Sequence, residues 1–325
     1  MLYANTGAGP RETVAATHPM RPDAIRAPWL DLVQPSEDER ALAERASGLR
    51  IPTEAELAEI ETSSRAYQEG DVLYLSTPMS YRDARGISRV APLGFVLSPG
   101  VLVTIRFAEL PGIESFAGRF GAGHQESDAA GAFVGLVEAL VDRMADVLEQ
   151  LGADLDAVSQ RVFHPDPASG PAVRDARLRG TLGQVGRIGD SLSNLRDSLL
   201  GVMRIVQYVP ETAKPWLPKA HQPKFRAIRQ DLQSLGEYDQ QLANKVQFLL
   251  DATLGFINIE QNNSIKVLTV VSIVGVPPTL VASIYGMNFQ NMPELHWAWG
   301  YQYGMAMIVL SAVVPLLLFR WKGWI

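Results

Sequence analysis

The chain has 325 residues, with 35 acidic and 29 basic side chains, no cysteine and a formal net charge of −6. This length is sufficient for two domains. The lack of cysteine excludes disulfides, thiolate metal sites and a cysteine nucleophile. The acidic balance argues against a nucleic-acid-binding surface, which requires clustered Lys and Arg.

The charge is distributed unevenly along the chain. After residue 264 the charged side chains are Lys266, Glu294, Arg320 and Lys322. The first 264 residues therefore hold 34 acids and 26 bases, a net charge of −8, whereas the last 61 residues carry +2. This division predicts an acidic cytoplasmic part followed by a tail that lies in a membrane.

The first 28 residues contain Pro, Gly and charged residues but no continuous apolar segment. We therefore expect residues 1–28 to be a disordered lead rather than a targeting sequence. Order is expected to begin at Trp29 with a short strand. Ser36 then precedes three acidic residues, which is typical of a helix N-terminus, and a second helix is expected from Thr53.

Three segments rich in β-branched and aromatic residues follow, at 71–81, 91–100 and 101–107. The turn residues 98–100 (Ser-Pro-Gly) predict that the last two segments form a hairpin. We therefore expect an α+β domain over residues 29–125.

The pattern becomes helical after this domain, and we expect a helical hairpin region over residues 131–222. Its second helix is predicted to end before Pro210. No proline occurs between Pro223 and Pro277, which predicts one long helix of about 80 Å, with residues 223–264 as its stalk. Its heptad-like apolar spacing is consistent with self-association or with packing against its own hairpin.

Two uncharged apolar segments follow, and each is long enough to cross a hydrocarbon core of about 30 Å. The spans are predicted at 265–285 and 300–319. Aromatic residues lie at both ends of the second span, and a basic tail follows at 320–325. The connection at 286–299 contains no Lys or Arg, so the positive-inside rule places it outside the cell and both termini in the cytoplasm.

One face of the first span carries small and hydroxyl side chains, which recur at steps of three and four residues. Such residues are also common where membrane helices pack. Two spans cannot enclose a polar path alone, so the tail is either an anchor or one part of a pore made by several copies. Asn262 and Asn288 extend this face, whose other members are Ile265, Leu268, Ser272, Val276, Thr279, Ser283 and Gly286.

The segment around the end of the first span carries an extended motif. Residues 285–289 read YGMNF and residues 292–295 read MPEL, with Trp297 and a Gly-Tyr pair at 300–301 after them. This segment resembles the signature of the CorA magnesium-transporter family. The similarity continues through the tail and, more diffusely, upstream, so that it covers residues 29–325.

The resemblance implies a CorA-like homopentameric funnel in the inner membrane, with first spans lining the pore and second spans facing lipid. Gly286, Met287 and Asn288 would form its outer selectivity mouth. The implied pore-lining positions are Asn262, Ile265, Leu268, Ser272, Val276, Thr279 and Ser283. Leu268 and Val276 would be apolar constrictions that close by dewetting.

The implied function is import of Mg2+, often also of Co2+ and Ni2+, driven by the membrane potential. Glu294 in the outer loop would attract cations, although an ordinary solvated charge explains it equally well. The five histidines show no paired spacing and no phosphate-binding glycine motif occurs, so we expect no cofactor and no enzymatic activity.

Some members of the family sense intracellular Mg2+ through paired acids, one of them on the upper stalk. Counting back from the pore places Ala227 at that position, with Asp231 the next acid. We therefore expect the sensor to differ in form here, with Asp231 as the candidate residue for cytoplasmic metal sensing. Two alternatives to a Mg2+ importer are a ZntB-like, proton-coupled Zn2+ transporter and a membrane-anchored cytoplasmic binding or enzymatic domain.

Overall fold

The computed structural model describes residues 1–6, 12–14, 27–120, 128–164, 171–287 and 292–324. It contains two compact units, one formed by residues 1–164 and 183–250 and the other by residues 165–182 and 251–325. The strands are β1 (Leu2–Asn5), β2 (Glu12–Val14), β3 (Trp29–Val33), β4 (Ala66–Glu69), β5 (Val72–Arg82), β6 (Ser88–Leu97) and β7 (Leu102–Arg106). The helices are α1 (Glu37–Ser47), α2 (Glu54–Leu57), α3 (Thr62–Arg65), α4 (Pro111–Arg119), α5 (Ala129–Phe163), α6 (Pro171–Thr212), η2 (Lys219–His221), α7 (Gln222–Tyr285), η3 (Pro293–His296) and α8 (Gly300–Trp321).

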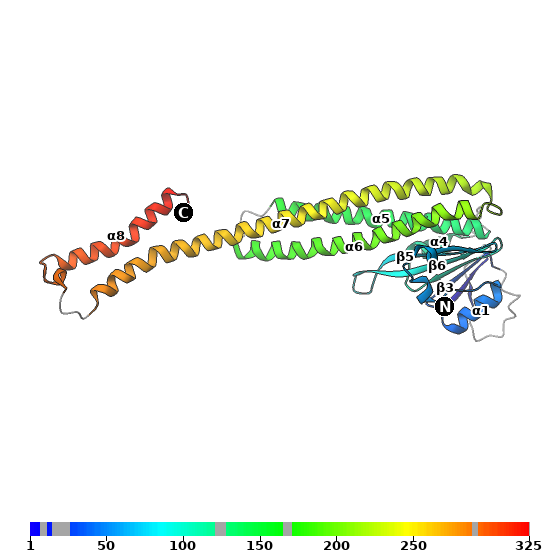
Figure 1. The fold of residues 1–325 in the computed structure, drawn as a ribbon, viewed down its shortest axis with the longest axis horizontal. Coiled ribbons are helices and arrows are strands. Elements are labelled where there is room, and N and C mark those ends of the chain that lie inside the picture. Colours follow the sequence, from blue (N-terminus) through cyan, green and yellow to red (C-terminus); the bar gives the residue numbers. More distant parts are fainter. Residues whose placement is uncertain (7–11, 15–26, 121–127, 165–170, 288–291, 325) are drawn as a thin grey trace. The chain divides into compact units, whose positions relative to one another are not determined.

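The first unit is built on one mixed sheet (Figure 1). Its strand order is β2-β1-β3-β7-β6-β5-β4, in which β3 and β7 run parallel. Both faces of its centre are buried. Leu30 and Leu32 of β3 join an apolar core with Leu42 of α1. On the other face, Trp29 packs against Phe116 of α4, and Phe95 packs against Phe133 of α5. Helices therefore cover the sheet on both sides, as expected for an α+β domain.

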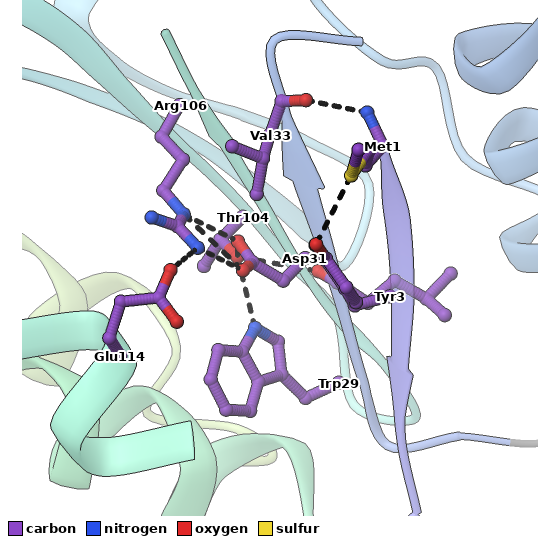
Figure 2. A network of polar contacts seen from close by, with 9 residues as sticks. Met1, Tyr3, Trp29, Asp31, Val33, Thr104, Arg106 and Glu114 are labelled. Atoms are coloured by element: carbon purple, nitrogen blue, oxygen red, sulfur yellow. Dashed lines mark hydrogen bonds and ion pairs between the residues drawn. The ribbon is translucent and has the colours of Figure 1, made fainter. Parts of the chain in front are cut away.

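The prediction that residues 1–28 are disordered is wrong for the parts that the structure describes. β1 pairs antiparallel with both β2 and β3 and extends the sheet by two strands. Leu2 is fully buried, and the Met1 ammonium donates to the Val33 carbonyl at 2.6 Å (Figure 2). Composition does not reveal this order because it comes from pairing with β3, which is distant in sequence. Residues 7–11 and 15–26 lie outside the described residues.

The local signals for turns and helix starts are confirmed. Ser36 caps α1 in a capping box with Glu39, and Thr53 caps α2 in the same way with Glu56. The turn at 98–100 joins the antiparallel strands β6 and β7. The second helix is only four residues long, however, and α4 adds a helix that the strand pattern did not indicate.

Long helices make up the rest of the first unit. The predicted end of the second hairpin helix before Pro210 is wrong, because α6 continues to Thr212. Proline removes only one backbone donor, and so close to a helix end the loss is small. The Ala213 amide still donates to the Val209 carbonyl at 2.9 Å and completes the last turn.

The apolar stripe of the stalk packs against the hairpin of the same chain. Phe225 of α7 lies 6.3 Å, ring centre to ring centre, from Phe133 of α5. Leu242 approaches Gly152 of α5, and a Cβ built on Gly189 of α6 lies 3.4 Å from Val246. Packing against its own hairpin thus accounts for the spacing in this part of α7, which residues 222–250 contribute to the first unit.

The helical hairpin is also attached to the sheet by polar and close contacts. The buried Ser198 hydroxyl of α6 accepts a hydrogen bond from the Ser80 amide of β5 at 2.9 Å and donates one to the Asn194 carbonyl at 3.0 Å. Gly201 lies against Thr77, where any larger residue would collide with the strand. These contacts hold α6 on β5 without space for sliding.

Candidate functional site

The second unit contains the end of α7 and the whole of α8, and both helices are long and apolar enough to cross a membrane. α7 is a single helix of 64 residues that contains both the stalk and the first predicted span (Figure 1). α8 has 22 residues, which matches the predicted second span within two residues at its end. A helix satisfies its own backbone polar groups, which a segment in lipid requires.

Pro277 and Pro278 lie inside α7 without ending it. Each proline lacks a backbone N–H, so the carbonyls of Ile273 and Val274 lose their helical donors. The hydroxyl of the next residue is bonded locally, because Thr279 donates to the Gly275 carbonyl at 2.9 Å. With its hydrogen used in this way, the Thr279 oxygen keeps free lone pairs as an acceptor.

The predicted pore face is exposed in this part of α7, as are Val271 and Leu280 on other sides of the helix. All the described positions of the face are exposed in the single chain: Asn262, Ile265, Leu268, Ser272, Val276, Thr279, Ser283, Gly286 and Met287. A stripe of half-buried residues runs along the same helix at Val270, Val274, Pro277, Val281 and Tyr285. With about 3.6 residues per turn, this stripe lies on the opposite side of the helix from the hydroxyl groups.

α8 approaches α7 on the half-buried side. A Cβ built on Gly304 of α8 lies 4.0 Å from the Tyr285 ring. The hydroxyl-bearing face therefore remains uncovered within the unit. In a membrane, a face with Ser and Thr at helical spacing is typical of helices that pack against a further helix.

The predicted mouth begins where α7 ends. The Gly286 amide donates to the Ala282 carbonyl at 3.0 Å, and the Met287 amide donates to the Ile284 carbonyl at 3.2 Å. Gly286 does not adopt a left-handed conformation. Its small size matters instead, because a Cβ at this position would lie 3.3 Å from the Ala282 oxygen. Asn288 lies outside the described residues.

Aromatic and basic residues lie at the ends of α8, as predicted for membrane interfaces. Trp297 and Tyr303 contact edge to face with ring centres 5.7 Å apart, and Phe319 stacks on Trp324 at 5.4 Å. Trp299, Tyr301 and Trp321 are more than 70% exposed. Glu294 lies in η3 and is half-buried.

The stalk positions considered for metal sensing are solvent-accessible. Ala227 and Asp231 are both exposed on α7. Among the residues that the structure describes, no group of three or more His, Asp or Glu side chains is arranged to hold a metal ion. Two charged features of the first unit have no signal in the sequence pattern: a buried Asp31–Arg106 pair and a cavity lined by basic residues at the start of α7.

The comparison with known families rests on nearly the whole chain. Residues 26–321 match the family model described as CorA-like Mg2+ transporter protein. The chain belongs to this family. It is 34% identical over 306 residues to the magnesium transport protein CorA of Yersinia pseudotuberculosis, and 33% identical over 302 residues to that of Escherichia coli K12, with 93% of both chains covered in each case.

Solved structures support the same fold. The complete structure of the CorA magnesium transporter from Methanocaldococcus jannaschii matches with a TM-score of 0.75 at 17% identity, covering 100% of this chain and 98% of that one. The cytoplasmic domain of ZntB from Vibrio parahaemolyticus matches with a TM-score of 0.55 at 11% identity over 79% of this chain. This member of the CorA-like family is therefore a membrane protein with two C-terminal spans, and the CorA interpretation is stronger than the ZntB alternative.

Proposed function

We propose that this CorA-like protein imports Mg2+ through a pore formed by five copies of the chain, in the inner membrane, with both termini in the cytoplasm. The observation that carries the proposal is the family match, which runs through both spans and ends at residue 321. The exposed hydroxyl face of α7 supports it, because several copies facing one axis would turn this face toward water rather than lipid.

The expected chemistry follows from the hydration of the ion. Mg2+ dehydrates reluctantly, so the mouth should offer neutral oxygens to the hydrated ion rather than a tight carboxylate cage. The Asn288 amides supply such oxygens at the mouth, and the Thr279 hydroxyl, already donating to Gly275, presents an acceptor below it. Rings of Leu268 and Val276 would close the path by dewetting.

The energy for import comes from the membrane potential. When a divalent cation enters a cell with a membrane potential of 100 mV, negative inside, its free energy falls by about 4.6 kcal/mol, twice the value for a single charge. Import therefore needs no nucleotide hydrolysis and no resident cofactor, and the protein acts as a transporter rather than an enzyme. Co2+ and Ni2+ are the expected minor substrates.

Uptake into proteoliposomes tests this proposal against the proton-coupled alternative. Purified protein is reconstituted, and the initial uptake of Mg2+, Co2+, Ni2+ and Zn2+ is measured with a negative-inside potential, with and without a pH gradient. We expect potential-driven Mg2+ uptake that is indifferent to the pH gradient. Zn2+ uptake that needs the gradient, with no Mg2+ flux, would favour the ZntB-like function instead.

Topology and assembly are tested separately from flux. A tag after Ile325 should be accessible only from the cytoplasm, and one inserted at Asn291 only from outside. When the purified protein is crosslinked, the largest species formed should be a pentamer. Finding both tags on the same side would contradict the two-span arrangement.

A further inference from the structure

A cavity of about 660 Å³ lies in the first unit, where the last turns of α6 meet the first turns of α7. Gln207 and Glu211 of α6 line one side, and Gln222, Arg226 and Arg229 of α7 line the other. Lys214, in the connection between the helices, completes the polar lining. Its volume is in the range of small-molecule sites, which is roughly 300–1,000 Å³.

The charge of this cavity is opposite to that of the surrounding domain. Lys214, Arg226 and Arg229 carry three positive charges, and Glu211 is the single acid in the lining. The three basic side chains are exposed, and none of them forms an ion pair with another residue in the described part of the chain. The first 264 residues together have a net charge of −8. Three unpaired cations around one cavity therefore give it a locally positive potential, which attracts anions.

The geometry points to phosphate as the bound group. Arg226 and Arg229 are three residues apart and project from the same face of α7, so two guanidinium groups can hold neighbouring phosphates. The cavity lies at the N-terminal start of a long helix, whose dipole adds to the positive potential. Gln207 and Gln222 add neutral amide donors. The exposed Ala227 is on another face of α7 and does not line the cavity.

We propose that this cavity binds a polyphosphate anion, such as the triphosphate of a nucleotide, in its Mg2+-free form. A bound Mg2+ ion cancels two negative charges of the chain of phosphates and occupies the oxygens that the arginines would contact. The Mg2+ complex should therefore bind more weakly. If the proposed Mg2+ transport holds, more of these sites would hold polyphosphate when free Mg2+ falls. Because Arg226 and Arg229 belong to α7, binding would then link a shortage of Mg2+ to the stalk helix.

Calorimetry with the full-length protein in detergent tests the site without any transport measurement. ATP is titrated in EDTA and again with excess Mg2+, and tripolyphosphate and adenosine are titrated in EDTA. We expect ATP and tripolyphosphate to bind in EDTA, adenosine to show no binding, and Mg2+ to weaken ATP binding at least about tenfold. The proposal would be overturned if adenosine bound as tightly as ATP, or if Mg2+-ATP bound as tightly as free ATP.

Variants locate the binding. Arg226→Ala and Arg229→Ala should each weaken the binding of ATP about tenfold, because each removes a charge-assisted contact. Arg187→Ala removes an exposed arginine from α6 outside the cavity and should change nothing. Equal effects of all three substitutions would mean diffuse attraction and would refute the site. Gel filtration confirms that each variant remains assembled.

A transport-dead Asn288→Ala protein separates this inference from the proposed function. It should bind ATP with the affinity of the unaltered protein. Loss of transport with binding intact leaves the site standing, whereas intact transport with no ATP binding in any form of the protein removes the site and leaves the proposed function untouched.

Discussion

Asp31 of β3 and Arg106 of β7 form an ion pair in which both side chains are completely buried. The Arg106 Nη2 atom lies 2.8 Å from one Asp31 carboxylate oxygen, and Nε lies 3.2 Å from the other (Figure 2). Thr104 donates to Asp31 at 2.7 Å and accepts from the Trp29 indole at 3.0 Å. Arg106 also contacts Glu114 of α4 at 2.5 Å, so the network joins two strands to a helix.

Removing one partner of this pair should destabilise the protein strongly. Asp31→Ala leaves the guanidinium buried with only Glu114 as counter-charge, for which a cost of about 3–5 kcal/mol is typical. The measurement is the thermal unfolding temperature of the full-length protein in detergent, which should fall by several degrees. The double variant Asp31→Leu/Arg106→Met should recover part of the loss, because it leaves no unpaired buried charge. A double variant that is less stable than Asp31→Ala would contradict this account.

The cap of α1 should make stability depend on pH in the acid range. Burial raises the pKa of Glu39, but hydrogen bonds from Ser36 and the Met1 ammonium outweigh it, and the net pKa lies below the ordinary value of 4.5. Because the pKa of Glu39 is lower in the folded than in the unfolded protein, its carboxylate stabilises the folded protein at pH values above the unfolded-state pKa. This contribution is lost as the pH falls through the folded-state pKa.

The expected size of this effect is about 1 kcal/mol, as for a helix cap. Glu39→Gln should lose stability near neutral pH but show less further loss below pH of about 4 than the unaltered protein. Glu37→Gln, which removes an exposed acid from the same turn, is the control. The test is the unfolding temperature measured across that pH range, and parallel curves for the two variants would argue against the cap.

Asn288→Ala should abolish selective Mg2+ flux while the oligomer stays assembled. The substitution removes the amide oxygens of the proposed mouth without touching the stalk, so initial Mg2+ uptake into proteoliposomes should fall at least about a hundredfold, equivalent to about 2.7 kcal/mol. Asn291→Ala, which removes another amide from the same outer connection, should retain uptake. Flux by Asn288→Ala equal to that of the unaltered protein would refute the assignment of the mouth.

Inhibition by intracellular Mg2+ should be present but weak in this protein, because Ala227 stands where a sensing acid is expected. The remaining attraction would come from Asp231 and dispersed acids, which are screened over about 8 Å at physiological salt. Ala227→Asp should therefore sharpen inhibition, and Ala227→Asn should not. Uptake into vesicles preloaded with graded Mg2+ at two salt concentrations is the measurement. If neither salt nor Ala227→Asp changes the inhibition, the sensor lies elsewhere.

Local patterns in the sequence were sufficient for the two membrane spans, the continuous α7 and several helix caps and turns. The two spans, the caps at Ser36 and Thr53 and the turn at 98–100 depend on neighbouring residues, so composition and spacing predict them directly. The unbroken run between Pro223 and Pro277 likewise predicted a continuous α7. The motif that begins at Tyr285 is specific enough to indicate the family from its residues alone.

Tertiary structure alone decided the features that depend on distant segments. β1 is ordered because β3 supplies its hydrogen-bonding partner, and Arg106 is buried because the parallel register of β3 and β7 brings Asp31 beside it. The stripe on α7 was compatible with two kinds of packing, and the contact between Phe225 and Phe133 shows that the first part of α7 packs against the hairpin of its own chain. Sequence spacing specifies which side chains share a face, whereas the surface that covers the face is set by long-range pairing and packing, which a periodic pattern does not encode.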